Sequence, residues 1–124
     1  HVRSIVGNFL EHSRIFFFLN DGEEELYMGS ADWMPRNLDR RVEILFPVLD
    51  DTLKEKVKHI LDVELADNTK AHVLKPDGEY EKIDRRGKVL VNSQKQFCEE
   101  AVAAVPKTDH VYRERVFVPA EPAE

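Results

Sequence analysis

The stretch "RIFFFLNDGEEELYMGS", residues 14–30, decides the fold of the first half of the chain. Two apolar runs, "RIFFFL" and "EELYMGS", flank the tripeptide Asn-Asp-Gly. Asn, Asp and Gly tolerate the positive φ angles that tight hairpin turns require, so the pattern predicts two antiparallel strands, over residues 15–18 and 25–29. The residues just before the first strand and just after the second should therefore meet at one end of the hairpin.

A third strand and a helix follow the hairpin. The run "RRVEILFPV" (40–48) alternates and then becomes continuously apolar, which predicts a buried strand over residues 41–46 closed by Pro47. Next, "DDTLKEKVKHILDVEL" (50–65) predicts a helix over residues 51–65, with good capping residues at its start. Its inward positions, at helical spacing, are Leu53, Val57, Ile60, Leu61 and Glu64.

The second half of the chain repeats these signals more weakly. "AHVLKPDGEYEKI" (71–83) predicts a short strand, a Pro-Asp-Gly turn and another short strand. "SQKQFCEEAVAA" (93–104) predicts a second helix, whose inward residues would be Phe97, Ala101 and Val102. Together the elements predict an α/β domain with a mixed β-sheet flanked by helices.

Composition limits the function. The 124 residues suffice for one domain with its own core, and 42% hydrophobic with 34% charged residues is typical of a soluble globular protein. A net charge of −6 argues against nucleic acid as a partner. The single cysteine, Cys98, excludes an internal disulfide framework, and no apolar run is long enough to cross a bilayer. We expect a cytoplasmic protein, with peripheral attachment at the inner membrane as the one alternative.

The ends of the chain predict its organisation. It begins without methionine and with apolar residues at once, as a fragment of a longer protein would. We expect residues 1–105 to form the domain. Residues 106–124, which contain three prolines and an acidic end, should form a C-terminal extension or tail.

A histidine and an arginine precede the first strand. In an extended chain His12 and Arg14 point to the same face. The guanidinium offers a planar fork of donors and the imidazole can give or take a proton near neutral pH, so the pair suits a phosphate. The hairpin should bring Ser30 and Asp32 to the same place. Glu11 points to the other face and is a poor partner for His12, and the pattern is too sparse for a zinc site.

Three arginines follow the hairpin. Arg36, Arg40 and Arg41 could pair with Asp32, Asp39 and Glu43, which is the more common fate of such a cluster, or Arg40 and Arg41 could contact phosphate. Trp33 is expected in the core rather than stacked on a nucleotide. The remaining histidines, His59, His72 and His110, lie in no motif.

The order His-x-Arg, hairpin, Gly-Ser-x-Asp resembles the phospholipase D motif, with Arg14 in place of its lysine and Asp32 in place of its asparagine. Three stretches of the sequence closely resemble the C-terminal domain of long-chain polyphosphate kinases, which have a phospholipase D-like architecture. They are "SIVGNFLEHSRIFFF" (4–18), "SADWMPRNLDRRVEILFPVLD" (30–50) and "LKEKVKHILDVELADNTKAHVLKPDGEY" (53–80). Asn8 and Gly29 depart from that family, which has arginine and serine there. The loss of a cation at Asn8 lowers the expected nucleotide affinity.

The resemblance implies a reaction. Members transfer the terminal phosphate of ATP reversibly to polyphosphate through a phosphohistidine, with Mg²⁺. That histidine belongs to the preceding domain and is absent from this chain, so the isolated fragment should be inactive. His12 matches the second histidine, which contacts the nucleotide phosphates and acts as general acid. Mg²⁺ would be held mainly by phosphates and by residues outside this chain, and the parent protein would be a homo-oligomer.

On the same resemblance we assign roles to the neighbours of His12. Arg14, Arg40 and Arg41 would contact ATP or polyphosphate, and Ser30, Asp32 and Asn37 would orient His12. Two alternatives remain. A phospholipase D-like phosphodiesterase or nuclease would need two copies of the motif and so a homodimer. A non-catalytic interaction domain would use the arginines to bind an anionic polymer or another domain.

Overall fold

The computed structural model describes residues 1–105, and the expected tail at 106–124, with His110, lies outside the described residues. Helices and strands alternate irregularly along the chain. They are β1 (Arg3–Ile5), β2 (Ile15–Phe18), a 3₁₀ turn (Asn20–Gly22), β3 (Glu25–Gly29), α1 (Pro35–Arg40), β4 (Leu45–Pro47), α2 (Asp51–Ala66), β5 (Ala71–Leu74), β6 (Tyr80–Lys82) and α3 (Ser93–Ala104).

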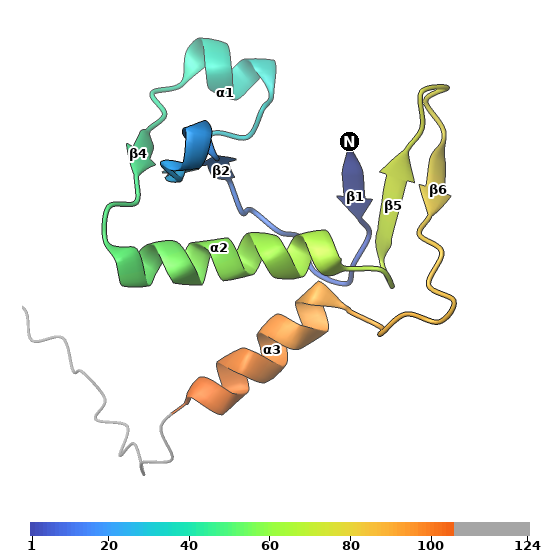
Figure 1. The fold of residues 1–124 in the computed structure, drawn as a ribbon. Helices are drawn as coiled ribbons and strands as arrows, with labels where there is room; N and C mark the ends of the chain where they lie inside the picture. Colours follow the sequence, from blue (N-terminus) through green and yellow to red (C-terminus); the bar gives the residue numbers. More distant parts are fainter. Residues whose placement is uncertain (106–124) are drawn as a thin grey trace, which may run out of the picture.

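The strands form two separate sheets, joined by α2 (Figure 1). One has the order β2-β3-β4 and the other β1-β5-β6, and every pairing is antiparallel. The α/β class is therefore confirmed, but the prediction of one mixed sheet is wrong. The reason is α2: its 16 residues carry the chain about 24 Å at 1.5 Å per residue. The strand that follows is thus far from the first sheet and pairs with β1 instead.

The hairpin at residues 14–30 forms as predicted. Residues of β2 and β3 pair from Ile15 with Met28 to Phe18 with Glu25. The turn between them has φ angles of 39° at Asn20, 55° at Asp21 and 100° at Gly22. These positive angles are the ones that Asn, Asp and Gly adopt at low cost, which is why this local signal was reliable.

The third strand is shorter and more exposed than predicted. β4 covers only Leu45–Pro47, so the predicted strand over 41–46 is wrong at its first four residues, but the strand does end at Pro47, its last residue. Proline is tolerated there because β4 is an edge strand, where its missing N–H breaks no ladder. All three residues of β4 are exposed, which contradicts the expected buried strand.

Both predicted helices are confirmed. Asp50 caps α2 by accepting a hydrogen bond from Leu53 N at 2.9 Å, and Asn92 caps α3 through Lys95 N at 3.1 Å. The inward face expected for α3 is wrong, because Ala101 and Val102 are exposed. Only its first turns are covered, since α3 leads away from α2 (Figure 1).

The second sheet was predicted in part. The short strands on either side of the Pro-Asp-Gly turn are confirmed as β5 and β6. β1 was not predicted, because three residues are too few to show a period. It pairs with β5, from Arg3 opposite Val73 to Ile5 opposite Ala71, and so brings the start of the chain to the end of α2.

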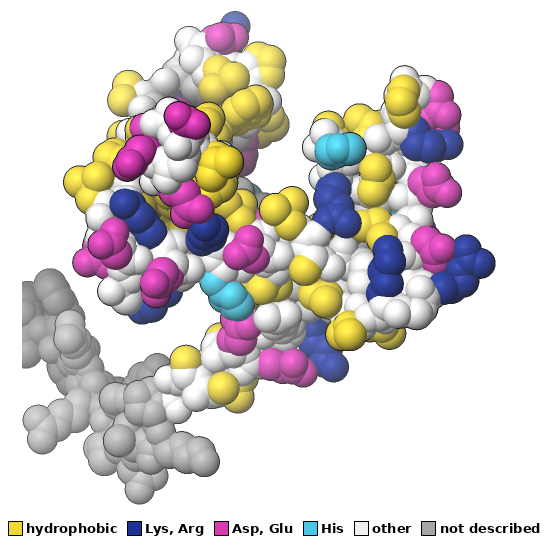
Figure 2. All heavy atoms as spheres, in the orientation of Figure 1, with side chains coloured by type: hydrophobic (Ala, Val, Ile, Leu, Met, Phe, Trp, Pro, Cys, Tyr) yellow, Lys and Arg dark blue, Asp and Glu magenta, His cyan; other side chains and the backbone are white. Residues whose placement is uncertain are grey.

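The core is small and lies between the first sheet and α2. Leu26, Val48 and Val57 are buried there, and Ile15, Phe17 and Met28 pack against them. Many large apolar side chains remain in solvent around α1 and β4. We call five of them the outer apolar face: Trp33, Leu38, Val42, Ile44 and Leu45, each 59% to 99% exposed. Figure 2 shows hydrophobic side chains gathered over this lobe.

Two further expectations can be compared with the structure. Trp33 is 78% exposed, so its assignment to the core is wrong, although its ring stacks on Phe16 with centroids 6.1 Å apart. Within the described residues no helix is both long and apolar enough to cross a membrane.

Candidate functional site

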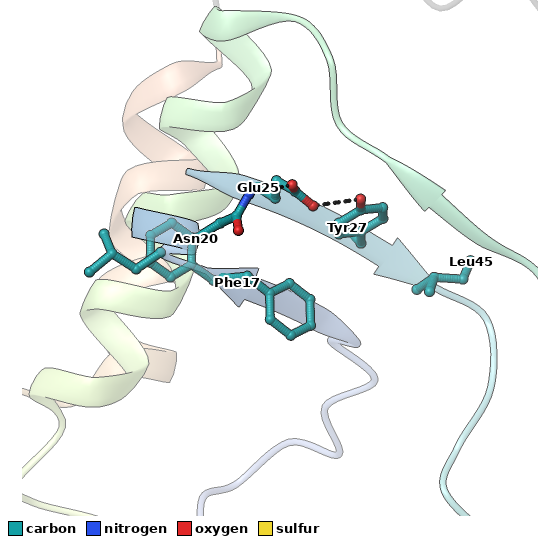
Figure 3. A pocket seen from close by; sticks show the side chains of 7 residues that line it. Phe17, Asn20, Glu25, Tyr27 and Leu45 are labelled. Atoms are coloured by element: carbon teal, nitrogen blue, oxygen red, sulfur yellow. Dashed lines mark hydrogen bonds between the residues drawn. The ribbon is translucent and has the colours of Figure 1, made fainter. Parts of the chain in front are cut away.

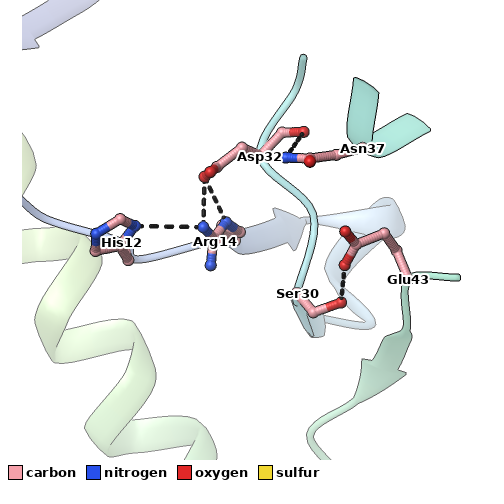
Figure 4. A network of polar contacts seen from close by, with 6 residues as sticks. All are labelled: His12, Arg14, Ser30, Asp32, Asn37 and Glu43. Carbon is pink, nitrogen blue, oxygen red and sulfur yellow. Dashed lines mark hydrogen bonds and ion pairs between the residues drawn. The ribbon is translucent and has the colours of Figure 1, made fainter. Parts of the chain in front are cut away.

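The open end of the hairpin brings His12, Arg14 and Asp32 together, as the sequence predicted (Figure 4). Gly29 N donates to Arg14 O at 3.0 Å, which continues the β2–β3 ladder to the residue before β2. Arg14 Nε donates to Asp32 Oδ1 at 2.8 Å, and Arg14 Nη2 reaches the same oxygen. The pair is partly exposed, with 21% of the arginine and 41% of the aspartate side chain accessible.

His12 lies beside the guanidinium. Its Nδ1 is 3.4 Å from Arg14 Nη2. Arginine has only donors, so Nδ1 is the acceptor in this contact and the proton of a neutral ring is on Nε2. The imidazole is exposed, and Arg14 Nη1 has no partner within residues 1–105. His12 Nε2, on the side of the ring away from Arg14, and Arg14 Nη1 could each donate a hydrogen bond to an anionic ligand.

Ser30 and Asn37 act on the segment that carries Asp32. Ser30 Oγ donates to Glu43 and accepts from Ile44 N at 3.0 Å, which ties residue 30 to the segment that leads from α1 into β4. Asn37, only 3% exposed, donates from Nδ2 to Asp32 O at 3.3 Å. Neither touches His12, so any influence of these two on the imidazole passes through Asp32 and Arg14 (Figure 4).

The later arginines are exposed: Arg36 lies in the first turn of α1, Arg40 in its last turn and Arg41 directly after it. The ion pairs among residues 1–105 do not include Arg36, Arg40 or Arg41, so the expected pairing with Asp32, Asp39 and Glu43 is not formed. Asp32 is held by Arg14 and Glu43 by Ser30 instead. The three cations are therefore available to an anionic ligand.

A buried polar cluster at the end of α2 was not foreseen. Asp67 is fully buried and its Oδ1 accepts from the N–H groups of Thr69, Lys70 and Ala71 at 2.8–3.2 Å. Its Oδ2 accepts from the N–H and the hydroxyl of Ser93, at 2.8 and 3.0 Å. Burial raises the pKa of Asp67, but these hydrogen bonds outweigh it and the pKa is lowered overall.

Asn68 extends the cluster. Its Nδ2 donates to Val89 O at 2.7 Å and its Oδ1 accepts from Val91 N at 3.0 Å. The end of α2, the start of β5 and the start of α3 are thereby held at one point. We call Asp67, Asn68, Ser93 and the next residue, Gln94, the polar junction. No sequence pattern marked it, because the contacts that join the end of α2 to α3 and to the segment before α3 span 21 or more residues.

Two acidic residues lie behind His12. The pKa of Glu64, on α2, is raised from its ordinary 4.5 to about 7, first by burial and then by the hydrogen bond with the Glu11 carboxylate and its charge, while a hydrogen bond from Ser13 acts in the opposite direction. Glu11, Glu64 and Arg3 line one cavity, and the Arg3 guanidinium donates a hydrogen bond to Leu65 O. Glu11 thus faces α2 and not His12, as its place in the strand predicted.

Two cavities differ in what they could bind. An open one of about 410 Å³ adjoins His12 and is lined mainly by Phe9, Ile60, Phe97 and Cys98. Another, of about 810 Å³, lies at the turn of the hairpin (Figure 3). Its only charged residue is Glu25, whose hydrogen bond from Tyr27, at 2.8 Å, raises the pKa of that phenol. A phosphate would be repelled there.

Two further histidines of the described chain, His59 and His72, have structural contacts. His59 pairs with Glu100 at 3.0 Å and so links α2 to α3. His72 Nδ1 lies 3.1 Å from Lys70 O. No group of three or more histidine, cysteine, aspartate or glutamate residues within 1–105 could hold a metal ion. Asp32, at the same end of the hairpin as His12, is engaged by Arg14 and does not fit a metal ligand.

Comparison with known proteins identifies relatives over most of the chain. The family "Polyphosphate kinase C-terminal domain 2" matches residues 1–94. A polyphosphate kinase of Pseudomonas aeruginosa is 52% identical over 106 residues, 85% of this chain and 15% of that protein. One of Lactiplantibacillus plantarum is 48% identical over 109 residues, 88% of this chain and 15% of that protein.

A solved structure agrees with the sequence matches. The crystal structure of polyphosphate kinase from Porphyromonas gingivalis superposes with a TM-score of 0.71 and 37% sequence identity, over 82% of this chain and 16% of that one. The chain therefore spans about 15% of the length of the curated relatives described above.

Proposed function

The chain belongs to the polyphosphate kinase family, as its C-terminal domain, and on this premise we propose that it supplies the leaving-group side of the active site. In the parent protein the terminal phosphate of ATP would pass reversibly to polyphosphate through a phosphohistidine in the preceding domain. The observation that carries the proposal is the contact of His12 with Arg14 at the exposed end of the hairpin.

The chemistry of the pair fits this role. A transferring phosphoryl group needs its equatorial charge neutralised and a proton or cation at the leaving oxygen. Arg14, oriented by Asp32, would give Nη1 to a phosphate oxygen. His12 would act as general acid in its imidazolium form: it would give the Nε2 proton to the leaving oxygen and keep the proton on Nδ1, so in that state Nδ1 would have to turn from the donor Nη2 of Arg14. Arg40 and Arg41 would bind further phosphates of ATP or of the polymer.

In this proposal Mg²⁺ is not bound by the residues of this chain. When bound, Mg²⁺ would neutralise phosphate charge. The residues near His12 do not fit a site for it, because Asp32 is paired with Arg14. We therefore expect the ion on the phosphates and on residues outside this chain, and assign no step of this chain to it.

The experiment that tests the class of reaction compares two assays on the full-length parent and on the isolated 124-residue chain. We expect the parent to form ATP from ADP and polyphosphate with Mg²⁺ and to leave bis-p-nitrophenyl phosphate intact. The isolated chain should do neither, since it lacks the phosphate-accepting histidine. Hydrolysis of the diester by a dimer of the isolated chain would instead establish a phosphodiesterase.

Arg14 gives a test of binding. Because an arginine–phosphate contact is charge-assisted, Arg14→Ala in the parent should weaken nucleotide binding by roughly 1.5–3 kcal/mol. Isothermal titration with a non-hydrolysable ATP analogue measures this. Arg86→Ala is the matched control, because Arg86 pairs only with its neighbour Asp84 on an exposed turn. Equal affinity in the two variants would remove Arg14 from the site.

A further inference from the structure

Gln94 connects α3 to the segment that leads into His12. Its Oε1 accepts from Asn8 N at 2.7 Å and from Phe9 N at 3.1 Å. Its Nε2 donates to Phe9 O at 2.8 Å and to Glu11 Oε1 at 2.6 Å. A side-chain amide has two acceptor and two donor positions, and all four are used here. The reversed amide would place N–H against N–H, so the orientation is fixed.

The chain leaves room for this contact at Gly7. A Cβ added to Gly7 would lie 2.2 Å from Gln94 Oε1, far inside van der Waals contact. Gly7 has no positive φ, so glycine is not required there by the backbone. Its lack of a side chain serves the close approach of the Gln94 amide.

The position of Gln94 is itself fixed. It is 8% exposed and follows Ser93, whose N–H and hydroxyl both bind the buried carboxylate of Asp67. The first turn of α3 is therefore tied to the end of α2. Gln94 reaches from this rigid point to residues 8–11, which belong to no helix or strand and have few other backbone partners in the described chain.

We propose that Gln94 is a positioning residue for His12: it fixes the backbone of Asn8 and Phe9 and the side chain of Glu11, and so sets where the imidazole stands beside Arg14. Only the consequence for catalysis rests on the proposed function. Without Gln94, Asn8, Phe9 and Glu11 would lose these bonds, while Arg14 would stay in place through β2 and Asp32. The His12–Arg14 contact would then be the first feature of the site to be lost.

Amide hydrogen exchange of the 124-residue chain, followed by NMR, tests the structural part without any activity. Gln94→Met keeps the volume and removes all four bonds. We expect the Asn8 and Phe9 amides to exchange about tenfold faster or more, because local opening becomes easier, and the His12 ring resonances to move. Gln96→Met is the matched control: it lies on the same helix and binds only Glu100.

A second variant removes the contact without changing Gln94. Gly7→Ala should displace the amide and give the same faster exchange, and it should add nothing in a Gln94→Ala background. In the full-length parent Gln94→Met should lower kcat about tenfold with a smaller change in KM, as for a misplaced catalytic group.

Each result has one meaning. Wild-type exchange of Asn8 and Phe9 in both Gln94→Met and Gly7→Ala would overturn the proposal, whatever the kinetics. Faster exchange at these two amides alone, with α2 amides unchanged, supports it. If His12→Ala leaves the parent fully active, the proposed function fails, but the exchange result still decides the role of Gln94.

Discussion

The polar junction at the end of α2 and the outer apolar face around α1 and β4 differ in how far their side chains are covered by the rest of this chain. At the junction every oxygen of a buried carboxylate has partners from this chain. On the outer face Val42 is 99% exposed and Trp33 78% exposed. The comparison teaches that stability and the placement of His12 depend on the junction, whereas the outer face contributes little to the fold of this chain.

The largest expected effect is at Asp67. Asp67→Ala leaves the buried N–H groups of Thr69, Lys70, Ala71 and Ser93 without their acceptor, and we expect a loss of about 3 kcal/mol or more in the free energy of unfolding. Urea titration followed by circular dichroism measures it. Asp84→Ala is the control, because Asp84 binds only exposed Arg86. Equal losses in the two variants would contradict the comparison.

Acidification should act on the same group. Because the pKa of Asp67 is lowered in the folded protein, its stabilisation is present above the ordinary value of 3.8. It is lost as the pH falls through the lower, folded value. Asp67→Asn, which keeps one acceptor oxygen, should fall between the wild type and alanine at pH 7 and should remove this part of the acid dependence.

A smaller effect of opposite sign is expected at Glu64, beside the junction. Its pKa is raised from 4.5 to about 7, so the folded protein holds a proton that the unfolded chain releases, and stability falls as the pH rises between these values. Glu64→Gln should remove this fall and stabilise the chain at pH 8 by about 1 kcal/mol, once solvent screening is allowed for. Unfolding curves at pH 5 and pH 8 decide it, and parallel pH dependence in both proteins would refute the shift.

The smallest effect is expected on the outer apolar face. Val42→Thr should change the free energy of unfolding of the isolated chain by less than about 0.5 kcal/mol, because the side chain buries almost nothing. Val57→Thr is the matched control, since Val57 belongs to the core. A loss at Val42 as large as that at Val57 would show that the outer face is packed after all.

The features that the sequence predicted are local. The hairpin follows from three turn residues, and its register alone brings Arg14 and Asp32 together across 18 positions. Both helices follow from capping residues and spacing. The predictions of a buried strand over 41–46 and of Trp33 in the core were wrong because apolar patterns were taken to mean burial. In this chain those apolar side chains face solvent.

The junction was missed because its contacts join distant parts of the chain. Gln94 stands in the first turn of α3, where glutamine is common on an exposed surface, and its partners are 83 to 86 residues away. Asp67 follows the last residue of α2, at the helix end where the helix dipole favours an acidic residue least. The rules for helix ends therefore predicted no stabilising role for it. Gly7 has no turn signature. Only the assembled structure shows why it carries no side chain.

The central claim is that the imidazole of His12 performs chemistry, and turnover of His12 variants in the full-length parent tests it most directly. We predict that His12→Ala lowers kcat at saturating ATP by about a hundredfold or more, the usual contribution of a general acid. His12→Gln should restore nucleotide binding, through its amide donor, without restoring kcat. Wild-type turnover by both variants would contradict the claim and leave His12 as a structural residue beside Arg14.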